Sequence, residues 1–531
     1  MSGLLSLLKS IKNSLATGII LTLYITYAIM SSVYLYVTHD GLKITLISTL
    51  LFVVLFIPVC RFMGWLGTKQ IVAADRREQR SWKTNLLFSG LCFLILMVWF
   101  IAFFPGSYQE DILNQIKQAL AGEYDTWHPV WHTLLFFTIP LKLTQTIWSI
   151  VVFQIVWFSL ALGYMCEVIY RHAGRIWAVI VFAYIMISPY TGYILMYVYK
   201  DVAFAIACML AVTVTADAYM SGHLKDMKWI GCILLGFILA NATLFRYNGV
   251  LFTAVFIVIL FFHMSPARCV TVAATMILSI MLIQGPVYDA VGTARADTEV
   301  IQTVGMPMSI IGNAVVETPE LVDPEITEFA YSIAPREVWE ERYARGNFNL
   351  MKYGGIHNQT PIEEAGVYDI FEMGLRCLNE SPEASIDSWF ALTDFVYGLD
   401  IQDKADIDVM KNDIRTNDYE LKPAGINPLA SLLGLYARVF RLKGFNIFRK
   451  LGFAILMLLT VMLSRLGWRS LSAWKRVLFG LPVLAYDFGT MLLLSGHDSR
   501  FFFLTFTIVP VLIIMIMHEH DRADGPELST Q

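Results

Sequence analysis

Acidic and histidine side chains gather in one polar stretch between two long apolar runs. Residues 107–137 read SYQEDILNQIKQALAGEYDTWHPVWHTLLFF and include Glu110, Asp111, Asp125, His128 and His132. A carboxylate can take a proton from a reacting hydroxyl, and carboxylate and imidazole groups together can bind a metal ion. Charged groups close to a bilayer are costly and are functional candidates for that reason.

Three further charged motifs stand at the ends of apolar runs. They are VYKDV with Lys200 and Asp201, LFRYNG with Arg246 and Asn248, and SGHDSRFFF with His497, Asp498 and Arg500. Carboxylates and cations that converge from separate helices suit a reaction in which a hydroxyl is deprotonated while an anionic leaving group departs.

Each of these motifs also has a plainer explanation. Glu110 and Asp111 could simply begin a solvated helix, where acids favour the positive end of the helix dipole. Asp201 could pair with the lysine before it or cap the following helix. Arg246 and Arg500 could be interfacial arginines that extend their charge toward water. The chemistry therefore depends on whether these side chains meet in space.

The composition predicts an α-helical polytopic membrane protein. Of 531 residues, 56% are hydrophobic and only 15% are charged, and the mean hydropathy is +0.59. These values are too apolar for a soluble enzyme of this size. Apolar runs of spanning length predict about twelve (11–13) transmembrane helices, near residues 16–37, 44–60, 85–104, 146–166, 176–197, 202–220, 229–244, 249–262, 269–287, 451–466, 478–494 and 501–517.

Lysine and arginine in short loops predict the orientation, because they favour the cytoplasmic side. The basic loop 61–83 is therefore expected inside, which makes both termini cytoplasmic and places residues 105–130 outside. The N-terminal apolar run is interpreted as an uncleaved signal anchor. The apolar segment 130–143 is too short to span and is expected to be a re-entrant or interfacial helix.

The predicted domain organisation follows from this topology. It consists of an N-terminal transmembrane module at 1–287 with its catalytic first outer loop at 105–130, an acidic extracytoplasmic domain at 288–428, a basic amphipathic juxtamembrane helix at 429–450, C-terminal transmembrane helices at 451–517 and a cytoplasmic tail at 518–531. The juxtamembrane helix carries Arg438 and Arg441, which would either bind a lipid phosphate or anchor the chain to anionic headgroups.

The order and sidedness of these motifs resemble the membrane glycosyltransferases of the C superfamily (GT-C), in particular a bacterial branch. The similarity rests on FPGSYQEDILNQ…GEYDTWHPVWHTLL after the third span, followed by YKDV, FRYNG and a late SRFF. It covers residues 104–249 and, more loosely, the last two spans. It implies a GT-C-like helical bundle and transfer of a sugar from a polyprenyl-phosphate or polyprenyl-diphosphate donor on the outer face.

The resemblance also implies roles for individual residues. Asp111 matches the first-loop acid that acts as general base, and the adjacent Glu110 leaves open which of the two acts. Asp201 matches a second acid that assists metal or acceptor binding, and His128 takes the place of a metal or phosphate ligand. Cations that would bind the donor phosphate are Lys200, Arg246 and Arg500, with Arg438 and Arg441 as further candidates. The oxygen ligands of Asp111 and Asp201 would suit Mg or Mn.

These observations predict a bacterial plasma-membrane glycosyltransferase with an extracytoplasmic active site. Its expected partners are a polyprenyl-phosphate sugar lipid and a cell-surface glycan, polymer or lipid acceptor, and no nucleic acid. An oligosaccharide ligase or polymerase that uses lipid-diphosphate donors is the alternative among enzymes. A flippase or transporter of such lipids is the alternative from another class, although its charges are expected near the middle of the spans.

Overall fold

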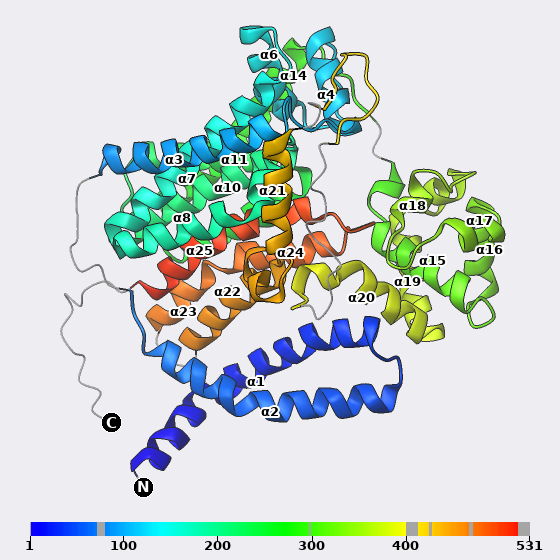
Figure 1. Ribbon diagram of the computed structural model, residues 1–531, viewed down its shortest axis with the longest axis horizontal. Helices are drawn as coiled ribbons and strands as arrows, with labels where there is room; N and C mark the ends of the chain where they lie inside the picture. The colour runs from blue at the N-terminus through cyan, green and yellow to red at the C-terminus, as the bar shows by residue number, and fades with distance from the viewer. Residues whose placement is uncertain are drawn as a thin grey trace.

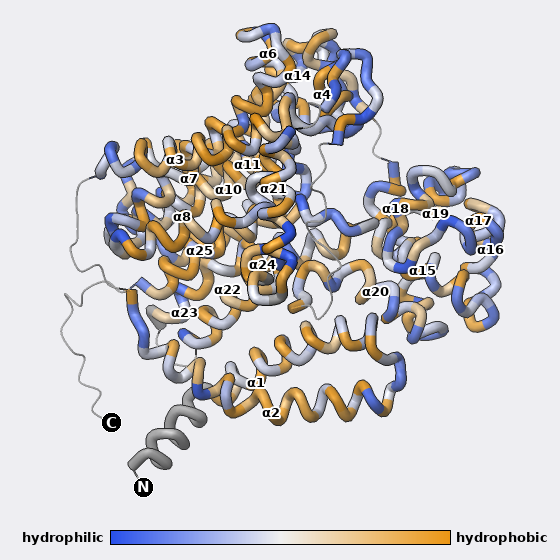
Figure 2. Tube along the Cα trace, in the orientation of Figure 1, coloured by the Kyte–Doolittle hydropathy of each residue, from blue (hydrophilic) through white to orange (hydrophobic). Residues whose placement is uncertain are grey.

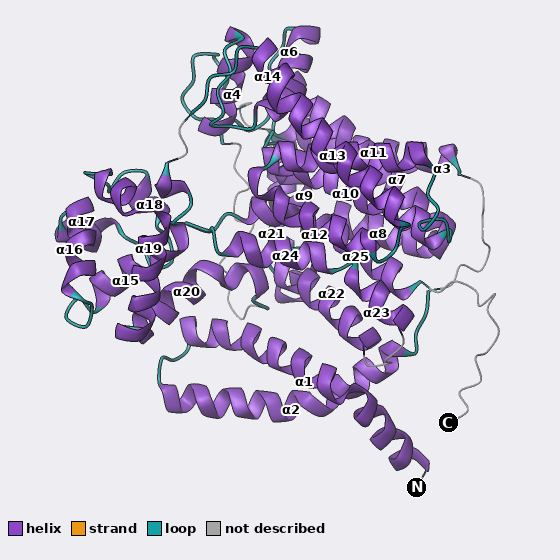
Figure 3. Cartoon of the chain, turned by 180° about the vertical axis from the view of Figure 1, so that it is seen from behind, coloured by secondary structure: helices purple, strands orange, loops and turns teal. Residues whose placement is uncertain are grey.

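The computed structural model describes residues 2–71, 80–296, 299–399, 413–423, 427–466 and 471–518. Throughout these ranges the chain forms helices and loops and no extended strand (Figure 3). The predicted helical fold class is therefore confirmed. The predicted cytoplasmic tail after residue 518, residues 72–79 of the basic loop and residues 400–412 of the acidic block lie outside the described residues.

Two long N-terminal helices form a hairpin along one edge of the molecule (Figure 1). They are α1 (Ser2–Tyr36) and α2 (Gly41–Gly67). Asp40 caps α2 by accepting hydrogen bonds from the backbone N–H groups of Leu42 and Lys43. The most apolar stretch of α2 has no buried residues, and the helix is coloured mainly as hydrophobic in Figure 2. Such a surface requires lipid around it.

The main bundle packs helices from both halves of the chain (Figure 1). Its members are α3 (Trp82–Ala102), α7 (Ser149–Ala173), α8 (Arg175–Ile187), α10 (Lys200–Met220), α11 (Trp229–Phe245), α12 (Val250–Phe261), α13 (Pro266–Leu282), α22 (Leu451–Leu466), α23 (Leu471–Leu478), α24 (Leu481–Met491) and α25 (Phe503–Met517). The central helix α10 is buried along most of its length and packs against α7, α11 and α25.

Among the described residues, seven helices are long and apolar enough to cross a membrane. The other predicted spans form shorter helices, so the count of twelve remains a prediction. The predicted span 176–197 is wrong as one continuous helix, because α8 ends at Ile187 and α9 (Pro189–Ile194) begins after Ser188. Proline lacks the N–H that helix continuation needs, and it disfavours helical geometry in the residue before it.

The predicted first outer loop and the segment after it form short helices at one end of the bundle. These are α4 (Glu110–Ala121), α5 (Val130–His132), the π-helical turn η1 (Thr133–Thr138) and α6 (Ile139–Thr144). A helix at 130–143 is therefore present, and its re-entrant or interfacial placement remains a prediction. The helix α4 ends at Gly122, whose φ of 74° favours glycine. Beyond α13, the chain continues through a second π-helical turn, η3 (Ile283–Val287), into α14 (Tyr288–Ala290).

The acidic block folds around a core of its own. Its helices are η4 (Val300–Gln302), α15 (Gly305–Glu317), α16 (Pro324–Ile333), α17 (Arg336–Arg342), α18 (Asn349–Lys352), α19 (Thr360–Glu380) and α20 (Pro382–Tyr397). Trp339 is fully buried at the centre and its indole N–H donates to the carbonyl of Ala330 at 2.9 Å. Ser381 directly precedes α20, and its hydroxyl shares a hydrogen bond with Thr318 instead of capping the helix.

The predicted basic helix at 429–450 is shorter than expected. The helix α21 (Pro428–Val439) packs against α3, and its residue Tyr436 donates a hydrogen bond to the carbonyl of Ile187. The chain then turns through η5 (Lys443–Phe448) into α22. Arg438 therefore lies in the last turn of α21, whereas Arg441 lies beyond its end.

Candidate active site

The N-terminus of α10 carries the first charged pair of the site. Tyr199 has extended backbone angles, and the helix begins at Lys200 with Asp201 in its first turn, where an acid is favoured by the helix dipole. The Asp201 side chain is only 1% exposed. A carboxylate so buried needs a compensating charge, and two arginines supply it.

Arg246 is the first of these arginines. It stands in the extended break between α11 and η2 (Tyr247–Gly249), and its Nη1 contacts the Oδ1 atom of Asp201. Its Nε donates to Asn248 Oδ1 at 2.5 Å. Gly249 completes this motif because a Cβ there would lie 2.8 Å from the carbonyl oxygen of Ala242. The FRYNG sequence thus lets the chain turn sharply while it holds a buried guanidinium in place.

Arg500 is the second arginine, and it joins three carboxylates. It lies in η6 (Ser499–Phe502), directly before α25. Its guanidinium is 3.4 Å from Asp111 Oδ2, 3.8 Å from Asp201 Oδ2 and 3.6 Å from Asp498 Oδ1. All three distances exceed the usual length of a charge-assisted hydrogen bond. The contacts therefore hold the guanidinium and the three carboxylates close together but leave part of their hydrogen-bonding capacity unused.

An aromatic ring fixes the position of the Arg500 guanidinium. The guanidinium carbon lies 4.5 Å from the ring centroid of Tyr199, within the range of a cation–π contact. The Tyr199 hydroxyl donates to Gln109 Oε1 at 2.5 Å, and Gln109 Nε2 donates to Asp413 Oδ2 at 2.9 Å. This chain of contacts ties the start of α4 to the start of α10.

Asp111 is the most exposed of the three carboxylates that contact Arg500, ahead of Asp498 at 36%. It occupies the first turn of α4, and 42% of its side chain is exposed. Burial of the carboxyl would raise its pKa, but the positive charges of Arg500 and Lys200 outweigh that effect and hold the pKa of Asp111 below its ordinary value. It is therefore ionised at neutral pH. Glu110, its neighbour, is exposed on the same helical turn.

The two histidines of the first loop are buried. His128 is 3% exposed, and burial together with Lys200 lowers its pKa to about 4, so it is neutral at pH 7. His132 shares a hydrogen bond of 2.8 Å between its Nδ1 and Gln115 Oε1. Among the described residues, nothing hydrogen-bonds Nδ1 of His128 or Nε2 of His132.

The predicted metal ligands do not form a ligand set. Within the described part of the chain, no three His, Cys, Asp or Glu side chains group as a metal site would require. Asp111, Asp201 and His128 are therefore not assembled for this purpose. Asp201 instead faces Arg246 and Arg500, which already compensate its charge.

The acidic block reaches the same site through α18. Its residue Asn349 accepts a hydrogen bond of 2.7 Å from Ser495, and its backbone N–H donates to the Ser495 carbonyl at 3.0 Å. Lys352, at the end of α18, donates to Gln302 at 2.5 Å. Burial lowers the pKa of Lys352 to about 8, although Asp498 and Asp111 oppose the shift. The loop that carries Asp498 and Arg500 is thus attached to the acidic block.

The basic segment after α21 meets this region through Arg449. A small cavity of about 20 Å³ is lined by Arg449, Tyr190 and Ser499 among others. Ser499 directly precedes Arg500 in the chain. The candidate phosphate ligand Arg438 is exposed in the last turn of α21. The sequence analysis assigned Arg449 no site role, since nothing local distinguishes it from the other basic residues of its segment.

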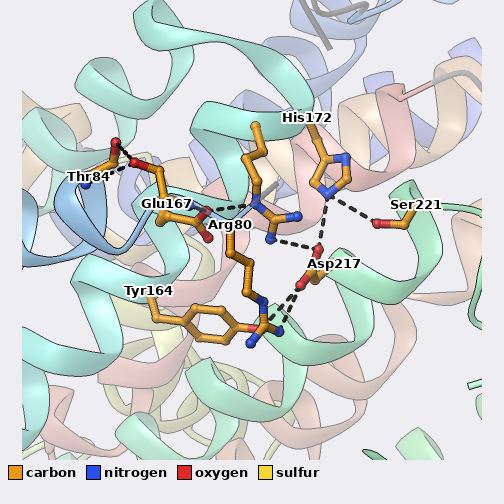
Figure 4. Close-up of polar contacts among 9 residues, drawn as sticks. Arg80, Thr84, Tyr164, Glu167, His172, Asp217 and Ser221 are labelled. Atoms are coloured by element: carbon orange, nitrogen blue, oxygen red, sulfur yellow. Dashed lines mark hydrogen bonds and ion pairs between the residues drawn. The ribbon is translucent and has the colours of Figure 1, made fainter. Parts of the chain in front are cut away.

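A second charged cluster, which the sequence analysis missed, lies at the opposite end of α10 (Figure 4). Arg171 donates to Glu167 at 2.7 Å and to Asp217 at 2.9 Å. Arg80 and His172 also contact Asp217, at 3.2 and 3.1 Å. The available signal was an ionisable residue, Asp217, within a predicted span.

No protein-family model, curated protein or solved structure matches this chain.

Proposed function

We propose that this chain is a membrane glycosyltransferase. It moves a sugar from a polyprenyl-phosphate-linked donor to a glycan, polymer or lipid acceptor at the extracytoplasmic surface of a bacterial plasma membrane. The observation that carries the proposal is the convergence of Asp111, Asp201, Arg246 and Arg500, from four separate segments, with Asp111 left partly accessible. The resemblance of the same motifs to GT-C enzymes supports the sugar and lipid assignment.

The cations have the chemistry to hold the donor phosphate. Guanidinium groups bind phosphate oxygens in bidentate fashion, and they stabilise the negative charge that develops on a departing phosphate. Arg500 is suited to this role because its contacts with carboxylates, at 3.4 to 3.8 Å, are long. Lys200 adds a second charge beside Asp111. Arg246, which faces Asp201, would hold the carboxylate in place and raise the local positive potential.

Asp111 is the proposed general base. In an inverting transfer, an acceptor hydroxyl oxygen forms a bond to the sugar's anomeric carbon, and the bond from that carbon to the donor phosphate oxygen breaks. The hydroxyl proton passes to Asp111, and the bonding electron pair remains on the phosphate. Asp111 is preferred to Glu110 because it contacts Arg500, which places it beside the proposed phosphate site. Because the metal ligands are not assembled, none of these steps is routed through Mg or Mn.

The two charged clusters support a membrane placement for the site. Asp201 and Asp217 are sixteen residues apart on α10, which corresponds to about 24 Å along the helix axis. This length is close to the thickness of a bilayer's hydrocarbon core. We assign the Asp111 end to the extracytoplasmic side and the Asp217 end, next to the basic loop, to the cytoplasmic side, with both termini cytoplasmic.

The test is a transfer assay on purified protein in nanodiscs, with a panel of radiolabelled polyprenyl-phosphate hexoses and a cell-envelope extract as acceptor. Release of polyprenyl phosphate that requires Asp111 supports the proposal. If release occurs only from lipid-diphosphate oligosaccharides, the ligase or polymerase alternative replaces it. Movement of the intact lipid between leaflets without bond cleavage would instead establish a flippase.

A further inference from the structure

The folded acidic block (residues 288–428) contains an apolar groove that the proposed reaction does not use. The groove lies between α15, α19 and α20 and has a volume of about 360 Å³, at the lower end of the range for ligand pockets. All of its lining residues are uncharged, and they include Pro307, Ile310, Phe371, Leu375, Leu378 and Trp389.

One wall of the groove is unusually exposed for a domain in water. Leu375 is 60% exposed and Leu378 36%, and both follow Phe371 at helical spacing on α19. Ile386 on α20 is 40% exposed. Continuous apolar surface of this kind marks an interaction site, since burying it releases about 25 cal/mol for each Å² removed from water.

Helix α20 connects the groove to α1, a candidate membrane-spanning helix. In Figures 1 and 3, α20 lies alongside α1. Trp389, which lines the groove, donates through its indole N–H to the hydroxyl of Tyr27 at 3.0 Å. Tyr34 donates to the carbonyl of Glu383 at 3.2 Å. Tyr27 is near the middle of the candidate span Leu15–Tyr36. The Trp389 wall of the groove therefore lies about halfway along a membrane-spanning helix.

The neighbouring helix α2 indicates what surrounds this part of α1. Leu42, Leu46 and Leu50 stand in the half of α2 that follows the turn from α1, and they are 60% to 70% exposed. Side chains of this kind at these exposures need hydrocarbon around them. Lipid chains therefore flank the hairpin over the same length at which α20 packs on it.

We infer that this groove binds an acyl chain of a bilayer phospholipid. The inference goes beyond the proposed sugar transfer and does not depend on it. A hydrocarbon chain suits the groove because it needs no hydrogen-bond partner. A peptide in the same place would bring backbone N–H and C=O groups that must be satisfied, and the Trp389 indole N–H, the polar side-chain group in the lining, already donates to Tyr27.

Site-specific photocrosslinking tests the inference on the full chain. Leu375 is replaced by p-benzoylphenylalanine, and the protein is reconstituted in nanodiscs of phosphatidylethanolamine and phosphatidylglycerol, illuminated and weighed by intact mass spectrometry. Leu378 provides a second position in the groove. Glu328, exposed on α16, provides the control, because α16 lies on the side of the domain away from α1 (Figures 1 and 3).

The expected result is an adduct with the mass of one phospholipid at Leu375 or Leu378, at least tenfold more abundant than at Glu328. Equal labelling at all three positions, or no lipid adduct at the two groove positions, overturns the inference. A second arm adds polyprenyl phosphate to the nanodiscs. If the adduct then has the polyprenyl mass alone, the occupant is the carrier lipid and the phospholipid assignment is wrong. Sugar transfer is measured separately, so failure of either proposal is recognised without the other.

Discussion

The two charged clusters at the ends of α10 differ in how completely their charges are paired. Around Asp217, the buried Arg171 makes contacts of 2.7 and 2.9 Å with two carboxylates, and its side chain is only 4% exposed. Around Asp201, Arg500 is shared among three carboxylates at 3.4 to 3.8 Å and is 22% exposed, and Asp111 is 42% exposed. We call the first the closed cluster because its central Arg171 is buried, although Arg80 at its edge is 70% exposed. We call the second the open cluster because Arg500 and Asp111 stay partly accessible.

This difference separates a structural ion network from a candidate reaction site. A buried and fully paired network holds helices in register, because breaking one partner leaves an uncompensated charge. A partly accessible group of cations and carboxylates can exchange its internal contacts for contacts with substrate. Changes in the first cluster should therefore affect folding, and changes in the second should affect activity.

The largest expected effect is on activity in the open cluster. Asp111→Asn should lower transfer by roughly 10²- to 10⁴-fold, because it removes the base while it keeps the shape of the side chain. Thermal stability and the size-exclusion profile should stay near the wild type. Normal transfer by this variant would contradict the assignment of Asp111. Glu123→Gln, which removes an exposed acid of the same loop, serves as the matched control. Glu110→Gln decides between the two adjacent acids.

In the closed cluster, the expected effect is on stability. Arg171→Gln should destabilise the protein by about 3 to 5 kcal/mol, since Glu167 and Asp217 lose their shared cation. The midpoint of thermal aggregation in detergent measures the change. Arg175→Gln alters an exposed residue three positions after His172 and should leave the midpoint unchanged. Loss of transfer activity by Arg171→Gln with no change in the aggregation midpoint would contradict the distinction between the two clusters.

Donor binding should respond to Arg500. Arg500→Gln should weaken binding of a polyprenyl-phosphate sugar by roughly tenfold to a hundredfold, which corresponds to the loss of one or two charged hydrogen bonds. Arg500→Lys should recover part of the affinity, because the charge remains and the bidentate geometry does not. Lipid affinity by native mass spectrometry measures both. Unchanged affinity in the glutamine variant would make Arg500 an interfacial anchor.

Arg500→Gln should also shift the pH dependence of transfer. In the wild type, the lowered pKa of Asp111 keeps the base ionised until the pH falls below the ordinary value for aspartate. The stability that this ionised carboxylate contributes is present above its unfolded pKa and is lost as the pH falls through the folded pKa. Without Arg500, burial is less opposed and the pKa rises, so the acid limb of the rate profile should move to higher pH. An unmoved limb would show that another group sets it.

The smallest expected effect concerns Arg438. Because it is exposed in the last turn of α21, Arg438→Gln should change donor affinity by no more than about 0.5 kcal/mol. A loss as large as that of Arg500→Gln would extend the open cluster to α21 and restore the predicted role of this arginine as a phosphate ligand.

Several elements of the fold could be predicted from the sequence because their causes are local. The apolar runs predict α3 and α10 with ends within a few residues, and they predict α1, α2 and α7 with one end that differs by seven residues or more, since length and hydropathy decide whether a segment can span a membrane. The break between α8 and α9 also had a local cause in Pro189, which the apolar run masked. The predicted bounds of α11 and α12 agree with the structure to within one residue at each end. The helix α24 is shorter than the predicted span 478–494, and Pro482 in its first turn is a local mark for its start.

The candidate site was predictable as a set of residues and not as an arrangement. The sequence analysis selected Asp111, Lys200, Asp201, Arg246 and Arg500 because charges at the ends of apolar runs are costly. It also grouped Asp111, Asp201 and His128 as metal ligands, which the fold does not assemble. Arg246 and Arg500 lie beside Asp201 instead. The sequence does not show whether a metal ion or an arginine compensates this carboxylate.

What the sequence by itself determined is therefore which segments are helices in an apolar environment and which charges stand at their ends. Hydropathy and capping act over a few neighbouring residues, so they can be recognised in one dimension. Only the tertiary structure decided which of those ends meet. Arg500 and Asp111 are 389 positions apart in the chain, and their contact depends on how α25 packs against α10. The burial of α20 against α1 was decided in the same way, through packing between segments that carry no local signal for one another.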